Sequence, residues 1–145
     1  MDKTTAVANQ IVKSLLMHTC VESFGVLHQG YFMHFRNDQS NDIELYIDSD
    51  MIFHPQQHEQ FSQDERMLLG MNSVNLKRVM NTWCTNNADL EVHFEDGSWF
   101  RVIGTSDDGY EPWQLSDGGN MAEGGTLLIA SSGDSNYAIW QPDND

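Results

Sequence analysis

Apolar residues recur at helical spacing in the first part of the chain. Between Thr4 and His18 they fall about three and four residues apart, which places them along one face of a helix. Thr4 or Thr5 can cap its start, because a threonine hydroxyl can accept a backbone N–H that the first helical turn leaves unpaired. The pattern predicts an N-terminal helix with an apolar face of Ala6, Ile11, Val12, Leu15 and Leu16.

From about Phe24 the period changes to two, which is typical of strands. An aromatic strand spans Tyr31–Phe35, and a polar turn follows over residues 37–42. In the next segment, Ile43–Ile47, apolar and polar residues alternate, so its three apolar side chains share one face. A second turn leads into a short strand, Met51–His54, which a proline ends.

A second helix is expected from Ser62 to about Gly70. The residues Ser62-Gln63-Asp64-Glu65 match a capping box, in which the serine hydroxyl accepts from the third helical residue and the glutamate bonds back to the cap. Met67, Leu68 and Leu69 would then pack inward. Gly70 is expected to end this helix early, which makes it short.

The best-defined hairpin of the chain joins Leu90–Phe94 to Ser98–Val102. A three-residue loop, with Gly97 in the left-handed region, puts all the apolar residues of both strands on one face. A two-residue turn would instead pair Phe94 with Trp99 and mix Arg101 into the apolar face. The three-residue loop is therefore expected, with Glu91, His93, Glu95, Trp99 and Arg101 on the other face.

The last third of the chain is rich in Gly and Asp. It contains a short strand at Trp113–Leu115 and a closing hairpin of Thr126–Ala130 and Tyr137–Trp140, with a turn at Gly133-Asp134. The two His-Phe hairpins, Phe32–Ile47 and Glu91–Val102, resemble each other, and each follows a predicted helix. We expect one α+β domain over residues 1–145. It is mostly antiparallel, a sandwich or strongly curved sheet of about eight to ten strands, with two pseudo-repeated hairpin units, an N-terminal helix and one short second helix.

The chain is strongly acidic. Twenty-two Asp and Glu oppose seven Lys and Arg, a formal net charge of −15. Such a field repels nucleic acid and anionic membranes and attracts cationic proteins. With two cysteines, no secretory signal and no apolar run of about 20 residues, the cytoplasm is the expected location. After Arg101 there is no basic residue, whereas eight acidic ones follow: Asp107, Asp108, Glu111, Asp117, Glu123, Asp134, Asp143 and Asp145.

Catalytic and cofactor motifs are not evident. The chain has no Gly-x-Ser-x-Gly elbow, and its paired glycines do not have P-loop spacing. His54 and His58 have the four-residue spacing of a helical zinc pair, but Pro55 disfavours a helix at His54. Acidic turns such as Asp48–Asp50 do not match a calcium loop. The expectation is a protein without catalytic residues, metal or cofactor.

Part of the sequence resembles small bacterial immunity proteins of polymorphic toxin and contact-dependent inhibition systems. The resemblance covers about the last third: the Leu90–Val102 hairpin, then Tyr110-Glu111-Pro112-Trp113, then Tyr137-Ala138-Ile139-Trp140. It implies a non-enzymatic protein that binds and neutralises a cognate toxin domain, often a basic nuclease. It transfers no functional residue, because such proteins vary at their toxin-binding surfaces.

The leading hypothesis is thus an immunity protein whose acidic surface blocks the active site of a cationic toxin. Interfaces favour tryptophan at their centre, and Trp99 lies on the non-core face of its hairpin beside acidic residues. Two alternatives stay open: a carbohydrate-binding or small-ligand β module that uses Trp99, and a small hydrolase. The expected partner-binding residues are Glu91, Glu95, Asp96, Trp99, Asp107, Asp108 and Glu111.

Overall fold

The computed structural model describes residues 2–39, 41–56, 60–106, 109–119, 125–131 and 136–142, which form an α+β fold of two helices and mostly antiparallel strands. In chain order the elements are α1 (Lys3–Leu16), β1 (Cys20–Leu27), β2 (Gly30–Arg36), β3 (Asp42–Ile47), β4 (Met51–His54), α2 (Gln63–Val74), β5 (Val79–Cys84), β6 (Leu90–Phe94), β7 (Trp99–Val102), β8 (Trp113–Ser116), β9 (Leu127–Ala130) and β10 (Tyr137–Trp140).

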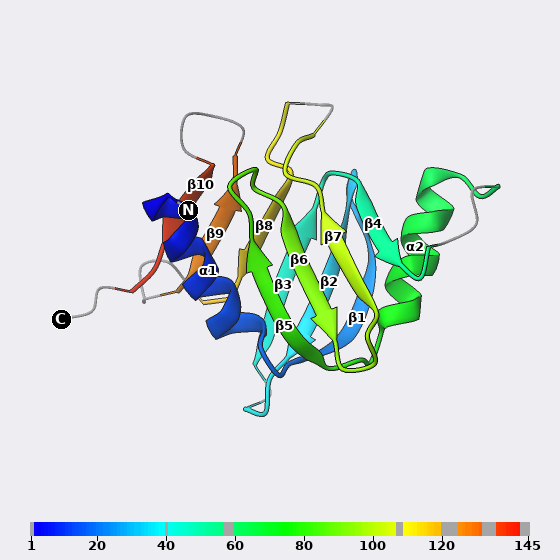
Figure 1. Ribbon diagram of the computed structural model, residues 1–145, viewed down its shortest axis with the longest axis horizontal. Helices are drawn as coiled ribbons and strands as arrows, with labels where there is room; N and C mark the ends of the chain where they lie inside the picture. Colours follow the sequence, from blue (N-terminus) through cyan, green and yellow to red (C-terminus); the bar gives the residue numbers. More distant parts are fainter. Residues whose placement is uncertain are drawn as a thin grey trace.

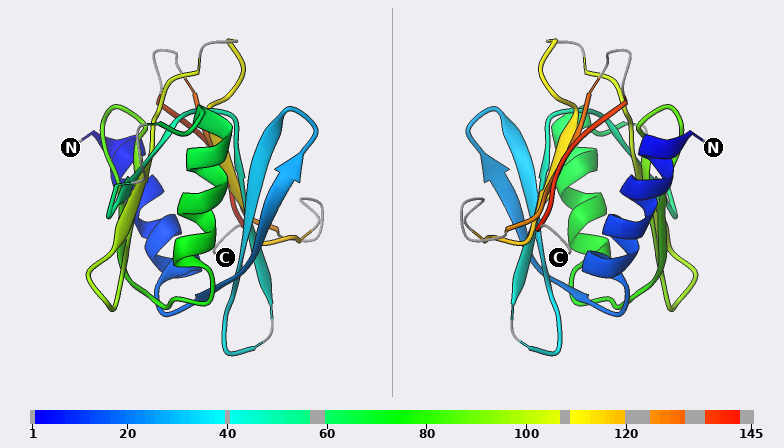
Figure 2. Two further views of the ribbon diagram at one scale, coloured as in Figure 1. Left: turned by 90° about the vertical axis from the view of Figure 1, so that its right-hand side faces the viewer. Right: turned by 90° about the vertical axis from the view of Figure 1, so that its left-hand side faces the viewer.

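The strands form two sheets that lie face to face (Figures 1 and 2). One has six strands in the order β1-β2-β3-β8-β9-β10, and the other has four in the order β4-β7-β6-β5. The helices lie at the two ends of this sandwich, α1 beside β5 and α2 on the side of β4 and β1 (Figure 1). The predicted α+β architecture with an N-terminal helix is confirmed.

The two halves of the chain exchange one strand each. The first half supplies the meander β1-β2-β3 and the second supplies β5-β6-β7, each after a helix. The next strand then crosses over, because β4 pairs with β7 of the second meander and β8 pairs with β3 of the first. The two predicted hairpin units thus lie in opposite sheets, and each sheet contains strands from both halves.

Alternation along the strands directs the apolar side chains between the sheets. The largest fully buried side chain is Trp113, whose indole N–H donates to the Ala88 carbonyl at 2.7 Å. The register Val92↔Phe100 and Leu90↔Val102 confirms the predicted core face of the β6–β7 hairpin. Gly97, at φ 89°, adopts the left-handed conformation that the three-residue loop requires.

The helix ends differ from the prediction in two places. Asp2, rather than Thr4 or Thr5, caps α1, since its Oδ1 accepts from the Thr5 N–H at 2.7 Å. The capping box of α2 is present as predicted, but that helix continues past Gly70 to Val74. Gly70 is kept within the helix because the ring of Phe53 packs directly against it, where a Cβ would lie 2.3 Å from Phe53 Cδ2.

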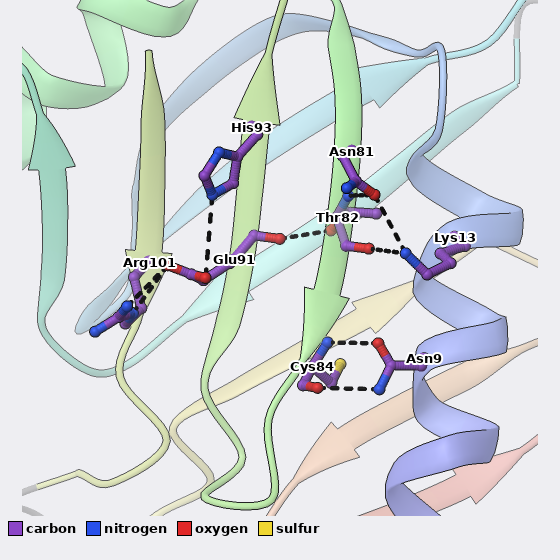
Figure 3. A network of polar contacts seen from close by, with 8 residues as sticks. All are labelled: Asn9, Lys13, Asn81, Thr82, Cys84, Glu91, His93 and Arg101. Carbon is purple, nitrogen blue, oxygen red and sulfur yellow. Dashed lines mark hydrogen bonds and ion pairs between the residues drawn. The ribbon is translucent and has the colours of Figure 1, made fainter. Parts of the chain in front are cut away.

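Side chains of α1 cover the free edge of β5. The amide of Asn9 donates to the Cys84 carbonyl and accepts from the Cys84 N–H, both at 3.0 Å, as a neighbouring strand would (Figure 3). One turn further along the helix, the Lys13 ammonium donates to the Thr82 carbonyl at 2.8 Å. These bonds occupy backbone groups that an edge strand otherwise leaves unpaired.

Candidate functional site

A row of four rings crosses the outer face of the four-stranded sheet. Strand pairing places His54 of β4 beside Trp99 of β7, Trp99 beside His93 of β6, and His93 near Trp83 of β5. The ring centroids are 5.6, 5.8 and 4.6 Å apart in that order, with planes within 25° of parallel. We call these four residues the ring row.

The rings in this row stand on the sheet with their faces toward one another. Adjacent strands are about 4.8 Å apart, and the ring centroids are separated by a similar distance. Two rings lying flat on the sheet would overlap if their centroids were 4.6 Å apart, as those of Trp83 and His93 are. An imidazole therefore stacks on each side of the Trp99 indole. The Trp99 ring has a nearly parallel imidazole toward each of its two neighbouring strands.

A buried carboxylate lies beside the row. Glu91 is only 7% exposed, and its Oε1 accepts from both Nε and Nη2 of Arg101, at 3.2 and 2.9 Å (Figure 3). The guanidinium also lies 5.9 Å from the centre of the Trp99 ring. On the other side, His93 Nε2 is 4.0 Å from Glu91 Oε2 and has no hydrogen-bond partner among the described residues. The ion pair of Glu91 and Arg101 thus lies on the two central strands of the four-stranded sheet, β6 and β7.

Exposed apolar side chains flank the row. Ile52, directly paired with Arg101 across the sheet, is 45% exposed, and Met80, at the bulge of β5, is 61% exposed. A surface that combines Trp, Arg, Met and a half-buried ion pair has the composition of an interface centre.

The sequence predicted the outward position of Glu91, His93, Trp99 and Arg101, and counted two of them, Glu91 and Trp99, among the partner-binding residues. The other members were not predicted: Ile52 and His54 belong to β4, whose partner β7 is far away in the sequence, and Met80 and Trp83 belong to β5, for which no strand was predicted. Alternation in β4 shows that Ile52 and His54 share a face, but it does not show that the face continues onto β7.

The other predicted partner-binding carboxylates are not gathered into one surface. Glu95 lies 3.7 Å from Arg78, and Asp96 lies 2.6 Å from the Lys77 ammonium, both in the turn before β7. The hydrogen bond from Lys77, with others from Ser98, holds the pKa of Asp96 well below its usual range. Because Glu91 is also paired, basic side chains offset the negative charge of this hairpin.

Glu111 follows β7 and lies at the opposite end of the strands, where the β7–β8 loop projects (Figure 1). Asp107 and Asp108 fall outside the described residues. At this end, two hollows of about 250 and 310 Å3 share Asp48 and Gln29 in their walls. Asp50 and Asp64 line the first and Glu111 lines the second. Asp50, Asp64 and Glu111 form no ion pair in the described part of the chain, so this end carries negative charge that no basic side chain offsets.

A further polar cluster lies on the outer face of the six-stranded sheet, around His34 of β2. His34 Nδ1 is 3.0 Å from the Ser23 hydroxyl, and its Nε2 is 3.0 Å from Glu44 Oε2. None of these three residues lines the hollows described above.

Burial raises the pKa of the Cys84 thiol to about 12, which makes it a poor nucleophile.

Metal-binding clusters of three or more His, Cys, Asp or Glu do not occur among the described residues, and His58 of the predicted zinc spacing lies outside them. No helix in the described ranges is long and apolar enough to cross a membrane. Searches of protein families, curated proteins and solved structures find no match to this chain. The resemblance to immunity proteins therefore stays a prediction.

Proposed function

We propose that this chain is an immunity protein: it binds a basic toxin domain, a nuclease, in the cytoplasm, blocks the toxin's active site and catalyses no reaction itself. The observation that carries this proposal is the ring row with its paired Glu91 and Arg101. In a chain with a net charge of −15, an open sheet face would be expected to carry solvated carboxylates. This face instead carries two tryptophans, two histidines and exposed apolar side chains.

The acidity has a separate role in this proposal. Because cations pair with Glu91, Glu95 and Asp96, these carboxylates are not the main contacts of a basic partner. The carboxylates at the loop end, together with the net charge, would accelerate encounter, since opposite charge raises association rates to roughly 10⁸–10⁹ M⁻¹s⁻¹ at low salt. Contacts at the ring row would then slow dissociation.

The stacking of the rings favours a protein partner over a carbohydrate. A sugar ring packs on an open aromatic face, whereas the Trp99 ring has His54, His93 and Arg101 within 6 Å of its centre. Indole rings combine a large apolar surface with one N–H donor, which suits the mixed apolar and hydrogen-bonding contacts of a protein interface.

The test is binding and inhibition of the toxin domain encoded next to this protein's gene. Calorimetry at physiological salt should show a tight complex, and the nuclease activity should fall in proportion to the complex formed. Trp99→Ala should weaken binding about 30-fold, which corresponds to a hot-spot loss of about 2 kcal/mol.

Trp140→Ala is the matched control, because Trp140 is 48% exposed but lies on β10 of the other sheet. It should leave the affinity unchanged. The proposal is wrong if the toxin domain does not bind, or if it binds without losing activity. Equal effects of the two tryptophan variants would place the interface elsewhere.

A further inference from the structure

A hollow lies along the open edge of β4. It has a volume of about 580 Å3, within the roughly 300–1,000 Å3 typical of ligand sites. Its walls include β4 itself, the first turns of α2 through Arg66 and Met67, and Trp99. Since His54 and Trp99 belong to both, the hollow is continuous with the ring row.

The backbone of β4 directs unused hydrogen-bonding groups into this hollow. In an antiparallel pair, the backbone groups of every second residue bond to the partner strand. The Ile103 N–H donates to the Asp50 carbonyl, so the residues that bond to β7 are Asp50, Ile52 and His54. The N–H and C=O groups of Met51 and Phe53 therefore point away from β7. In the described part of the chain, no group from outside the sheet bonds to Met51 or Phe53.

The two edge strands of the four-stranded sheet therefore differ in whether their outer backbone groups are hydrogen-bonded. At β5, Asn9 and Lys13 of α1 occupy the free backbone groups. At β4, the described residues provide no such cover, and the edge lacks the lysine, bulge or internal proline with which edge strands avoid pairing. A covered edge needs no partner, but an open edge can accept a strand.

The other sheet shows what can occupy this position. The exchange of strands makes β8 the counterpart of β4, since each is the strand that joins the meander of the other half. The outer edge of β8 pairs with β9, an apolar strand of sequence Leu-Leu-Ile-Ala. The position beside β4 that corresponds to β9 beside β8 is the hollow, and α2 forms part of its wall.

We propose that the hollow binds an extended segment of the partner protein, which pairs with β4 as an additional antiparallel strand. This inference rests on the proposed function. Alternate side chains of the segment would point toward Met67 and Phe53, which favours apolar residues there. Asp50, at one end of the hollow, favours a basic residue beside them. The partner segment is therefore an apolar strand with a Lys or Arg at the end that lies beside Asp50.

The experiment mixes the whole protein with the hexapeptide Lys-Thr-Val-Ile-Val-Lys, whose two termini are blocked. Binding is measured by NMR through the exchange of backbone amide protons. Binding should slow exchange of the Met51 and Phe53 amide protons at least tenfold, while those of Ile52 and His54, already bonded to β7, change little. The same peptide with alternate amides N-methylated keeps its charge but cannot pair as a strand, so it should not bind. This comparison separates strand pairing from simple attraction to an acidic protein.

Two variants at one position sharpen the test. Met51→Pro removes an N–H that faces the hollow and leaves the bonds of β4 to β7 intact, so peptide binding should be lost. Met51→Ala keeps that N–H and should bind within about threefold of the original protein. If Met51→Pro does not fold, the N-methylated peptide still decides the question in the unaltered chain.

Equal binding of the two peptides, or protection at other amides only, would overturn strand addition. So would a dimer in sedimentation that Met51→Pro abolishes, because the occupant would then be a second copy of this chain. The peptide experiment is independent of the toxin: failure of the peptide with an intact toxin complex refutes only this inference, and failure of the toxin complex refutes the proposed function.

Discussion

Replacing Asn9 tests whether α1 stabilises the protein by acting as a neighbour to the edge of β5. Asn9 is 8% exposed, and its amide makes two bonds of 3.0 Å to the backbone of Cys84, which is itself 2% exposed. In Asn9→Ala, the Cys84 N–H and C=O both lose their partner in a buried position. Each unsatisfied buried group costs about 1–3 kcal/mol, so with partial entry of water the loss is about 2–4 kcal/mol.

That loss is a large part of the free energy of unfolding, which is about 5–15 kcal/mol for a domain. At roughly 2–4 °C per kcal/mol for a chain of this size, the melting temperature should fall by about 5–15 °C. Urea unfolding gives the free energy, and hydrogen exchange should show faster exchange of the Cys84 amide. Asn9→Leu fills the space but cannot bond, so it should lose as much.

Asn72→Ala provides the matched control, because Asn72 is exposed on α2 and its substitution should change stability by less than about 0.5 kcal/mol. If Asn9→Ala loses under about 1 kcal/mol relative to this control, the two bonds to Cys84 are not what stabilises the edge. Full stability in Asn9→Leu would also refute the reasoning, since packing alone would then suffice.

Gly70→Ala should destabilise the protein in urea unfolding by about 1–3 kcal/mol despite the better helix propensity of alanine, because its Cβ would overlap the Phe53 ring; a neutral result would contradict this packing. Because the pKa of Asp96 is lowered by the bond from Lys77, the stability from this pair is fully present above about pH 4, the range of a free carboxyl, and is lost only as the pH falls through the lower folded pKa. NMR titration should show that lower midpoint, and Lys77→Met should raise it. A thiol reagent at pH 8 should leave Cys84 unmodified in the folded protein and label it in urea; labelling without denaturant would refute its burial.

The candidate site shows where local reasoning succeeds. The three-residue loop with Gly97 was predictable because only that loop length puts the apolar residues of both strands on one face. From it follows the outward position of Trp99 and Glu91. The charge of the same face was misjudged by sequence reasoning, because Lys77 and Arg78 precede β5 and reach the β6–β7 turn only through the pairing of β5 with β6.

The sequence by itself determined the elements: the helical and two-residue periods, the capping box of α2 and the β6–β7 register. These depend on neighbours within a few residues, where sterics and hydrogen bonding are local. Only the tertiary structure decided which strands meet. The exchange of β4 and β8, the row from His54 to Trp83 and the open edge of β4 all depend on contacts between distant segments. Many pairings satisfy the same alternation, and packing of the two sheets around Trp113 selects among them.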